Sequence, residues 1–254
     1  MGATNSAKLR LDVLLAERGY YESREKAHAA VMAGEVTVNG RVELKPGTKL
    51  ASDVELVAAD TSGKYVGRGA LKLERALEIW PVEVTDAVCM DIGASTGGFT
   101  EVLLRAGARK VYAIDVGYGQ LDWKLRNDER VVNMERTNFR HIDHSLIAEE
   151  VDIITADVSF ISLKHIFPGA APHLTQGGSL IALIKPQFEA ERGQVGKRGI
   201  IRDPEIRQET VRKVAGYAAD SGLIMDDVIE SPITGAKGNV EFLAFFKRGS
   251  VIVP

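Results

Sequence analysis

Five apolar runs alternate with helix-length segments between residues 87 and 188, and this alternation constrains the fold more than any other feature. Continuous apolar strands that are separated by helices are typical of a parallel sheet covered on both faces. The sequence therefore predicts an α/β domain. The runs are AVCMDIG (87–93), KVYAIDVG (110–117), RVVNMERTNF (130–139), VDIITADVSF (151–160) and GGSLIALIKPQF (177–188).

Two further apolar runs follow, LIMDDVIESPI (223–233) and VEFLAFFKR (240–248), with only GAKGN and its neighbours between them. No helix fits into this gap, so we expect the final strand to enter the sheet antiparallel. A mostly parallel, seven-stranded sheet with an antiparallel last strand resembles the Rossmann-like class I methyltransferase fold, whose cofactor is S-adenosylmethionine. We therefore predict this α/β fold.

The first residues follow another pattern. RLDVLLAERG (10–19) and SREKAHAAVMAG (23–34) have helical spacing and each ends at a glycine, with Ser23 as the expected N-cap. GEVTVNGRVE then alternates around Asn39-Gly40, a strong hairpin signal. We predict a small α+β domain over residues 1–58, a linker over 59–68 and the methyltransferase-like domain over 69–254, which starts with a helix at 69–80.

Composition excludes several classes of protein. The 254 residues are 45% apolar and 26% charged, enough for a sizeable core, and the net charge of −3 argues against a uniformly basic surface. The single cysteine, Cys89, allows neither a disulfide framework nor a thiolate zinc cluster, and we expect no metal. The first twelve residues do not resemble a signal peptide, and no run approaches the roughly 18 apolar residues of a membrane span. We expect a cytoplasmic protein without a membrane partner.

The turn DIGASTGGFT (91–100) follows the first strand and predicts a cofactor site. Ser95 replaces the second glycine of a dinucleotide fingerprint, which favours S-adenosylmethionine over a pyrophosphate cofactor. Asp115 ends the next strand, where a carboxylate can accept both ribose hydroxyls of either cofactor. An ordinary tight strand-to-helix turn is the alternative. The predicted cofactor residues are Asp91, Gly93, Ala94, Ser95, Gly97, Gly98, Phe99, Asp115, Asn138 and Asp157.

The methyl acceptor is narrowed by elimination. Methylation at C5 of a pyrimidine needs a cysteine nucleophile, and Cys89 lies inside the first strand. Methylation of an exocyclic nitrogen usually needs Asp/Asn-Pro-Pro-aromatic, but residues 157–160 read DVSF. A hydroxyl acceptor remains, and a ribose hydroxyl needs a base.

Four charged residues lie where such a base is expected. The carboxyl ends of parallel strands form the ligand crevice of an open α/β sheet, and an antiparallel strand presents its beginning there. Lys72, Asp157, Lys185 and Glu241 can therefore converge, with Lys185 as the base and the carboxylates holding the lysines. Taken singly, Lys72 could be a solvated helix residue and Glu241 could face water.

These four residues resemble the Lys-Asp-Lys-Glu tetrad of FtsJ/RrmJ-type RNA 2′-O-methyltransferases. Further motifs are similar to those of the TlyA family, often named haemolysin, and the N-terminal unit resembles the S-four RNA-binding domain. The resemblance implies methylation of cytidine 2′-hydroxyls in 16S and 23S ribosomal RNA, with S-adenosylmethionine as cofactor and ribosomal RNA or subunits as partners. The motifs are RLDVLLAERG, SREKAHAAVMAG, GRGALKLERAL, DIGASTGGFT, ADVSFISL and LIKPQFEA.

Basic residues in three places are candidates for contact with RNA phosphates. Residues 1–59 contain eight Lys/Arg and eight Asp/Glu, so a solvated mixed surface is the alternative there. The second place is the end of the predicted linker, and the third is the loop ERGQVGKRGIIRD (191–203), a possible substrate clamp. The candidates are Arg10, Ser23, Arg24, Lys26, Arg41, Arg68, Arg192, Lys197 and Arg198.

Three other functions stay open at this point: a dehydrogenase, a membrane-active haemolysin and a catalytically silent RNA-binding or assembly factor. The first needs a pyrophosphate loop and the second a membrane-insertable segment, and neither is visible. Methyl transfer to ribosomal subunits would distinguish the third.

Overall fold

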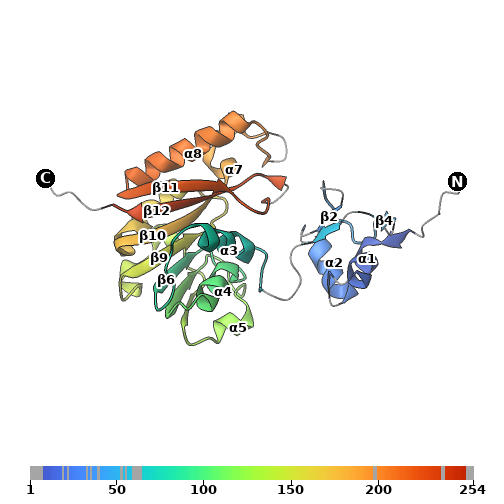
Figure 1. Cartoon of the computed structure of the whole chain (residues 1–254), viewed down its shortest axis with the longest axis horizontal. Coiled ribbons are helices and arrows are strands. Elements are labelled where there is room, and N and C mark those ends of the chain that lie inside the picture. The colour runs from blue at the N-terminus through green and yellow to red at the C-terminus, as the bar shows by residue number, and fades with distance from the viewer. Residues whose placement is uncertain are drawn as a thin grey trace. The chain divides into compact units, whose positions relative to one another are not determined.

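The computed structural model divides into two compact units, one formed mainly by the residues before Val66 and the other by Val66–Gly235 and 239–254 (Figure 1). The structure describes residues 8–18, 20–21, 23–32, 34, 36–38, 41–51, 54, 56–58, 65–196, 199–235 and 238–249. Most of the predicted linker, residues 59–64, lies outside these ranges, so the linker stays a prediction.

The N-terminal unit contains the two helices and the hairpin that its sequence predicts. β2 pairs antiparallel with β3, with Val38 opposite Arg41, and β5 adds a third strand that the sequence did not reveal. Asn39-Gly40 lie outside the described residues. Ser23 caps α2, because the backbone N–H of Lys26 donates to its Oγ at 3.2 Å. The elements are β1 (Leu9–Arg10), α1 (Leu11–Glu17), α2 (Arg24–Met32), β2 (Val36–Val38), β3 (Arg41–Val42), β4 (Lys49–Leu50) and β5 (Leu56–Ala58).

A small apolar core joins these elements. Leu11, Leu14 and Leu15 bury one face of α1 through their i, i+3 and i+4 spacing, and Ala27 and Val31 do the same for α2. Val36 and Leu56 complete the core from β2 and β5. The charged residues that lie between these positions are thereby directed away from the core, with the exception of Asp12, whose side chain is fully buried.

The larger unit is built on a seven-stranded sheet with the order β11-β12-β10-β9-β6-β7-β8. β12 runs antiparallel to both of its neighbours, and the pairs from β10 to β8 are parallel. The predicted fold class is therefore confirmed. The strands are β6 (Val88–Ile92), β7 (Lys110–Ile114), β8 (Val131–Met134), β9 (Val151–Ala156), β10 (Leu174–Ile184), β11 (Leu223–Glu230) and β12 (Phe242–Arg248).

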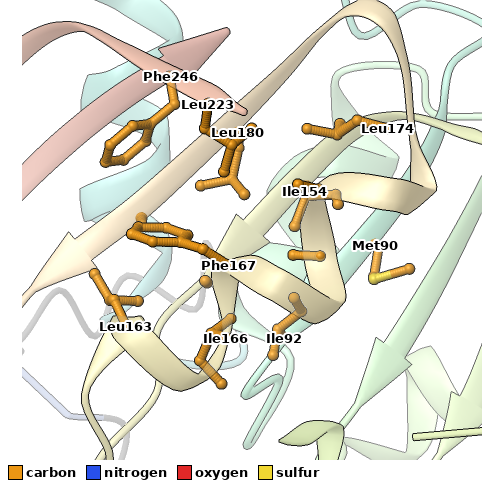
Figure 2. Close-up of a cluster of buried hydrophobic side chains, with 14 of the residues drawn as sticks. Met90, Ile92, Ile154, Leu163, Ile166, Phe167, Leu174, Leu180, Leu223 and Phe246 are labelled. Atoms are coloured by element: carbon orange, nitrogen blue, oxygen red, sulfur yellow. The ribbon is translucent and has the colours of Figure 1, made fainter. Parts of the chain in front are cut away.

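Successive side chains along each strand lie on opposite faces of this sheet. On one face Met90, Ile92, Ile154, Ile166 and Phe167 belong to one apolar cluster (Figure 2). On the other face α4 packs on β6 and β7, and Trp80 at the end of α3 stacks on Phe245. The helices are α3 (Ala70–Ile79), α4 (Gly98–Arg105), α5 (Trp123–Arg126), α6 (Phe167–Ala170), α7 (Pro186–Glu189) and α8 (Pro204–Ala219). No helix in the described ranges combines the length and the apolar character that a membrane crossing requires.

The strand register brings the ends of the central strands to one edge. Ile92 at the end of β6 lies opposite Ile114 of β7 and Ala156 of β9, so the segments that follow these three strands are neighbours. Ile184, the last residue of β10, lies opposite Phe242, the first residue of β12. The residues just beyond these positions therefore share the edge at which ligands of open α/β sheets bind.

Candidate active site and cofactor cavity

The four charged residues singled out in the sequence meet at this edge. Lys72 projects from the buried face of α3, Asp157 follows β9, Lys185 follows β10 and Glu241 precedes β12. Both lysine side chains are about 10% exposed, and that of Glu241 is 3% exposed. Lys72 is therefore not a solvated helix residue, and Glu241 does not face water.

The four side chains form one connected chain of ion pairs. Lys72 Nζ donates to Glu241 Oε2 at 2.9 Å and to Asp157 Oδ2 at 3.3 Å. Lys185 Nζ lies 2.7 Å from Asp157 Oδ1 and donates to Ser159 Oγ at 2.8 Å. Two ammonium groups and two carboxylates make the cluster neutral, which is the condition under which buried charges are tolerated.

Asp157 is the centre of this cluster. Burial raises the pKa of its carboxyl, but the positive charges of Lys72 and Lys185 outweigh burial and hold it below its usual value. Asp157 therefore stays ionised at neutral pH. Among the described residues, Lys72 contacts two carboxylates, whereas Lys185 contacts the shared carboxylate and the hydroxyl of Ser159.

A cavity of about 460 Å³ adjoins Asp157, at the ends of β6, β7 and β9. Half of the predicted cofactor residues line it: Gly93, Ser95, Asp115, Asn138 and Asp157. A cavity of about 480 Å³ opens at the opposite edge of the sheet, near Arg248 and the start of β11, and none of the predicted site residues that the structure describes lines it. The first cavity is therefore the candidate cofactor site.

Asp115 shapes this cavity through its backbone contacts. Its Oδ2 accepts the N–H of Ser95 at 2.8 Å, and its Oδ1 accepts the N–H of Gly117 at 2.7 Å. The carboxylate thus ties the glycine-rich turn to the end of β7. Each oxygen keeps a lone pair for a further donor, such as a ribose hydroxyl.

The other predicted cofactor residues, Asp91, Ala94, Gly97, Gly98 and Phe99, are not among the residues that line the cavity. Asp91 is fully buried and accepts hydrogen bonds from Thr100 Oγ1 at 2.7 Å and Thr155 Oγ1 at 3.0 Å. Burial raises the pKa of Asp91 to about 6, with a further contribution from the negative charge of Asp157, while the threonine hydroxyls oppose the rise.

Gly97 is constrained by packing and by its backbone conformation, and its role in cofactor binding stays a prediction. A Cβ there would overlap Leu125 Cδ1 and lie 2.8 Å from Leu121 Cδ1, so it would meet the apolar packing beside α5 rather than the cavity. Gly97 also has φ of +97°, in the left-handed region that favours glycine. The glycine therefore satisfies packing and backbone geometry at the start of α4.

The candidate RNA-binding residues can be placed only in part. Arg10 and Arg24 both contact the carboxylate of Asp12, and Lys26 is exposed in the first turn of α2. Arg68 is half-buried, and its Nη2 lies 3.5 Å from the carbonyl of Thr234. Lys197 and Arg198 lie outside the described residues, as do the side chains of Arg41 and Arg192.

Comparison with known proteins assigns both units. Residues 65–248 match the model of the FtsJ-like methyltransferases, and residues 9–56 match the S4 domain. The chain belongs to the FtsJ-like methyltransferase family. Family membership confirms the predicted methyl transfer and, with it, S-adenosylmethionine as the cofactor.

Relatives of this FtsJ-like methyltransferase match along almost the whole chain. YqxC of Bacillus subtilis is 50% identical over 94% of this chain and 85% of its own length. The 16S/23S rRNA (cytidine-2′-O)-methyltransferase TlyA of Mycobacterium tuberculosis is 43% identical over 94% of this chain and 90% of its own length. Hemolysin A of Brachyspira hyodysenteriae is 44% identical over 94% of this chain and 99% of its own length. A Streptococcus thermophilus structure that carries the hemolysin name superposes with a TM-score of 0.75, at 45% identity over 96% of this chain and 90% of the other.

The buried thiol of this FtsJ-like methyltransferase does not suit nucleophilic catalysis. Cys89 lies in β6 with no exposed surface, and burial raises the pKa of its thiol to about 12, with smaller contributions from Asp152 and Asp91. The thiolate that C5 methylation of a pyrimidine requires is therefore disfavoured.

Several residues of the site escaped the sequence analysis. Ser159 accepts a hydrogen bond from Lys185, and Gln120, Thr137 and Arg140 line the cavity. Phe160 also lines it, is 91% exposed and has φ of +64°. The only sequence signal that could have identified these residues is their position, a few residues after the end of a parallel strand.

Proposed function

We propose that this protein methylates the 2′-hydroxyl of cytidine in ribosomal RNA. The observation that carries the proposal is the buried cluster of Lys72, Asp157, Lys185 and Glu241 beside the cofactor cavity. Such a cluster offers a base and a means of holding it, which a hydroxyl acceptor requires. A relative that is 43% identical carries the name of a 16S/23S rRNA (cytidine-2′-O)-methyltransferase, which supports the same acceptor.

Lys185 is the base in this proposal. The ammonium group of Lys185 first loses a proton to water, and the resulting amine accepts the proton of the ribose hydroxyl. The hydroxyl oxygen bonds to the methyl carbon as the bond from that carbon to sulfur breaks, and Lys185 then returns the proton to water. Lys72, held by two carboxylates, fixes Asp157. Asp157 in turn directs Nζ of Lys185, together with the hydroxyl of Ser159.

S-adenosylmethionine, when bound, supplies a methyl carbon that is already activated by the adjacent sulfonium. Gly93, Ser95, Asp115 and Asn138 are the residues that would hold it, since they line the cavity next to Asp157. The protein's remaining task is alignment of the hydroxyl with this methyl group. Alignment of this kind can lower a barrier by about 7 kcal/mol or more.

The N-terminal unit has the role of docking structured ribosomal RNA in this proposal. Its match to the S4 domain and its partly exposed arginines, Arg10 and Arg24, support that role. Phosphate contacts position a protein on RNA without reading its sequence. A ribosomal substrate also implies a cytoplasmic location.

The test is a map of ribose methylation in ribosomal RNA. RNA from cells that lack the gene is compared with RNA from cells that carry the wild-type protein or the Lys185→Met variant. We expect a cytidine 2′-O-methyl group that appears only with the wild-type protein. A map that is identical in all three strains contradicts the proposal, and restoration by Lys185→Met refutes the proposed base.

A silent RNA-binding factor is distinguished in the same experiment. If the Lys185→Met protein restores growth or ribosome assembly without restoring methylation, docking alone accounts for the phenotype. Purified protein, ribosomal subunits from the deletion strain and labelled S-adenosylmethionine then show whether methyl transfer occurs at all.

A further inference from the structure

A buried carboxylate lies beneath two arginines of the N-terminal unit. Asp12, the second residue of α1, has a fully buried side chain, whereas the side chains of Arg10 and Arg24 are 42% and 56% exposed. A buried carboxylate between exposed cations is expensive unless it is fully hydrogen-bonded. The hydrogen bonds that Asp12 accepts from both arginines meet this condition, and they also hold the two guanidinium groups in place.

The contacts fix both guanidinium groups. Arg10 forms a two-bond fork with Asp12, Nε to Oδ1 at 2.9 Å and Nη2 to Oδ2 at 2.8 Å. Arg24 donates its Nε to the same Oδ2 at 3.1 Å. A Cβ at Gly47 would lie 3.0 Å from Nη1 of Arg10, so the chain at Gly47 lies directly against this guanidinium.

The pairing leaves donors for a ligand. The Arg10 fork occupies two of its five N–H groups, and the bond from Arg24 occupies one. Among the described residues, no other hydrogen bond of these two guanidinium groups is found. Two positive charges meet one negative charge, so the cluster carries a net positive charge, and both arginine side chains are partly exposed.

The carboxylate stays charged under ordinary conditions. Hydrogen bonds from Arg10 lower the pKa of Asp12 to about 2, those from Arg24 add to the effect, and burial opposes it. The clamp on both arginines therefore persists at neutral pH.

We propose that Asp12 combines Arg10 and Arg24 into one preformed binding site for RNA backbone phosphate. Asp12 is a positioning residue in this site: it touches no phosphate, but it fixes two guanidinium groups that would otherwise lose side-chain entropy when RNA binds. Guanidinium groups bind phosphate through paired N–H bonds, and a guanidinium group that Asp12 holds in place can use the N–H groups that this pairing leaves over. The proposal rests on the proposed docking of ribosomal RNA by this unit.

Asp12→Asn gives a test in which the lost charge and the lost positioning change the affinity for RNA in opposite directions. Loss of a negative charge beside RNA phosphates should tighten binding on electrostatic grounds. Loss of the clamp should weaken it, on the order of tenfold, because both arginines become mobile. The measurement is the Kd of the full-length protein for ribosomal subunits purified from the deletion strain, over a range of salt concentrations.

Matched variants complete the experiment. Glu17→Gln removes the same charge from the exposed end of α1 and should leave the Kd unchanged or slightly lower. Arg10→Lys combined with Arg24→Lys keeps Asp12 and every charge but cannot form the fork, so we expect weaker binding with an unchanged salt slope. In methyl-transfer assays, Asp12→Asn should raise the KM for subunits and leave kcat unchanged, which general unfolding would not do.

Binding by Asp12→Asn that equals or exceeds wild-type binding overturns the proposal. If circular dichroism shows that Asp12→Asn unfolds the unit, the lysine variant decides, and wild-type binding by it overturns the proposal too. Either result leaves the proposed methyl transfer standing. Failure of the wild-type protein to methylate ribose is a separate outcome, read from the methylation map rather than from the Kd.

Discussion

Lys72 and Lys185 bind opposite oxygens of one carboxylate, with Nζ of Lys72 3.3 Å from Oδ2 of Asp157 and Nζ of Lys185 2.7 Å from Oδ1. One ammonium group is thereby fixed relative to the other through a single rigid group. A change at either lysine alters the setting of the other, so the two should not behave as independent sites in mutational studies.

Lys185→Met should abolish most methyl transfer, since it keeps length and apolar character but removes the amine. Loss of a general base lowers the rate by about 10²- to 10⁴-fold. The affinity for S-adenosylmethionine, measured by calorimetry, should change little. Lys164→Met, at an exposed lysine, is the matched control and should retain wild-type turnover. Near-normal turnover by Lys185→Met would remove this residue from the mechanism.

Asp115→Ala should weaken S-adenosylmethionine binding. The variant loses the acceptor for the ribose hydroxyls and also releases the backbone N–H groups of Ser95 and Gly117. A hydrogen bond to a charged group contributes about 1.5–3 kcal/mol, and less where the donor is exposed, as it is at Ser95. Titration calorimetry measures the change, and Asp226→Ala, at an exposed position of β11, should match the wild type. Unchanged affinity in Asp115→Ala would place the cofactor elsewhere.

Gly97→Ala should destabilise the protein, because the new methyl group would overlap Leu125 and the backbone would be held at φ of +97°. We expect a loss of about 1–3 kcal/mol in the free energy of unfolding. Gly119→Ala separates the two causes, since Gly119 has φ of +70° but no atom within 4 Å of the position of a Cβ. Urea unfolding of both variants should show the larger loss for Gly97→Ala; equal losses would show that packing beside α5 contributes nothing.

Asp91→Asn should alter how stability depends on pH. The pKa of Asp91 is raised from 3.8 to about 6, so the folded protein binds more protons than the unfolded chain between these values. The contribution of this group is fully present below pH 4 and is lost as the pH rises through 6, by about 3 kcal/mol in all. Relative to the wild type, Asp91→Asn should therefore gain stability between pH 4 and pH 7. Unfolding curves with a constant difference over this range would contradict the assignment.

The strand ends of the sheet were predictable because apolar runs mark buried strands. Asp157 and Lys185 end such runs, and the short gap before Glu241 predicts the reversed strand, so the convergence of these residues follows from topology alone. The helix of Lys72 was visible in the helical spacing of 69–80. The roles of the four residues in catalysis stay predictions.

Side-chain direction within the cofactor turn was not predictable. Asp91 and Gly97 belong to the same glycine-rich stretch as Gly93 and Ser95, yet only the latter pair lines the cavity. The direction depends on the backbone angles of each residue in the turn, and a glycine permits φ of +97° at Gly97 without specifying it. The burial of Asp12 was missed for another reason. From sequence alone, a charged residue is expected to be exposed unless its partners, here Arg10 and Arg24, are known.

The pairing of β9, β10 and β12 also limits how the gene can change in length. Ala156 lies opposite Ala182, and Ile184 lies opposite Phe242. The positions of the charged residues just beyond these strands therefore depend on the number of residues in all three strands. Because strand side chains alternate between two faces, one inserted or deleted codon within these strands would turn the following side chain to the other face. Among homologous genes, we expect length differences to accumulate in the connecting loops, and we expect the three strands to keep their number of codons even where their residues differ.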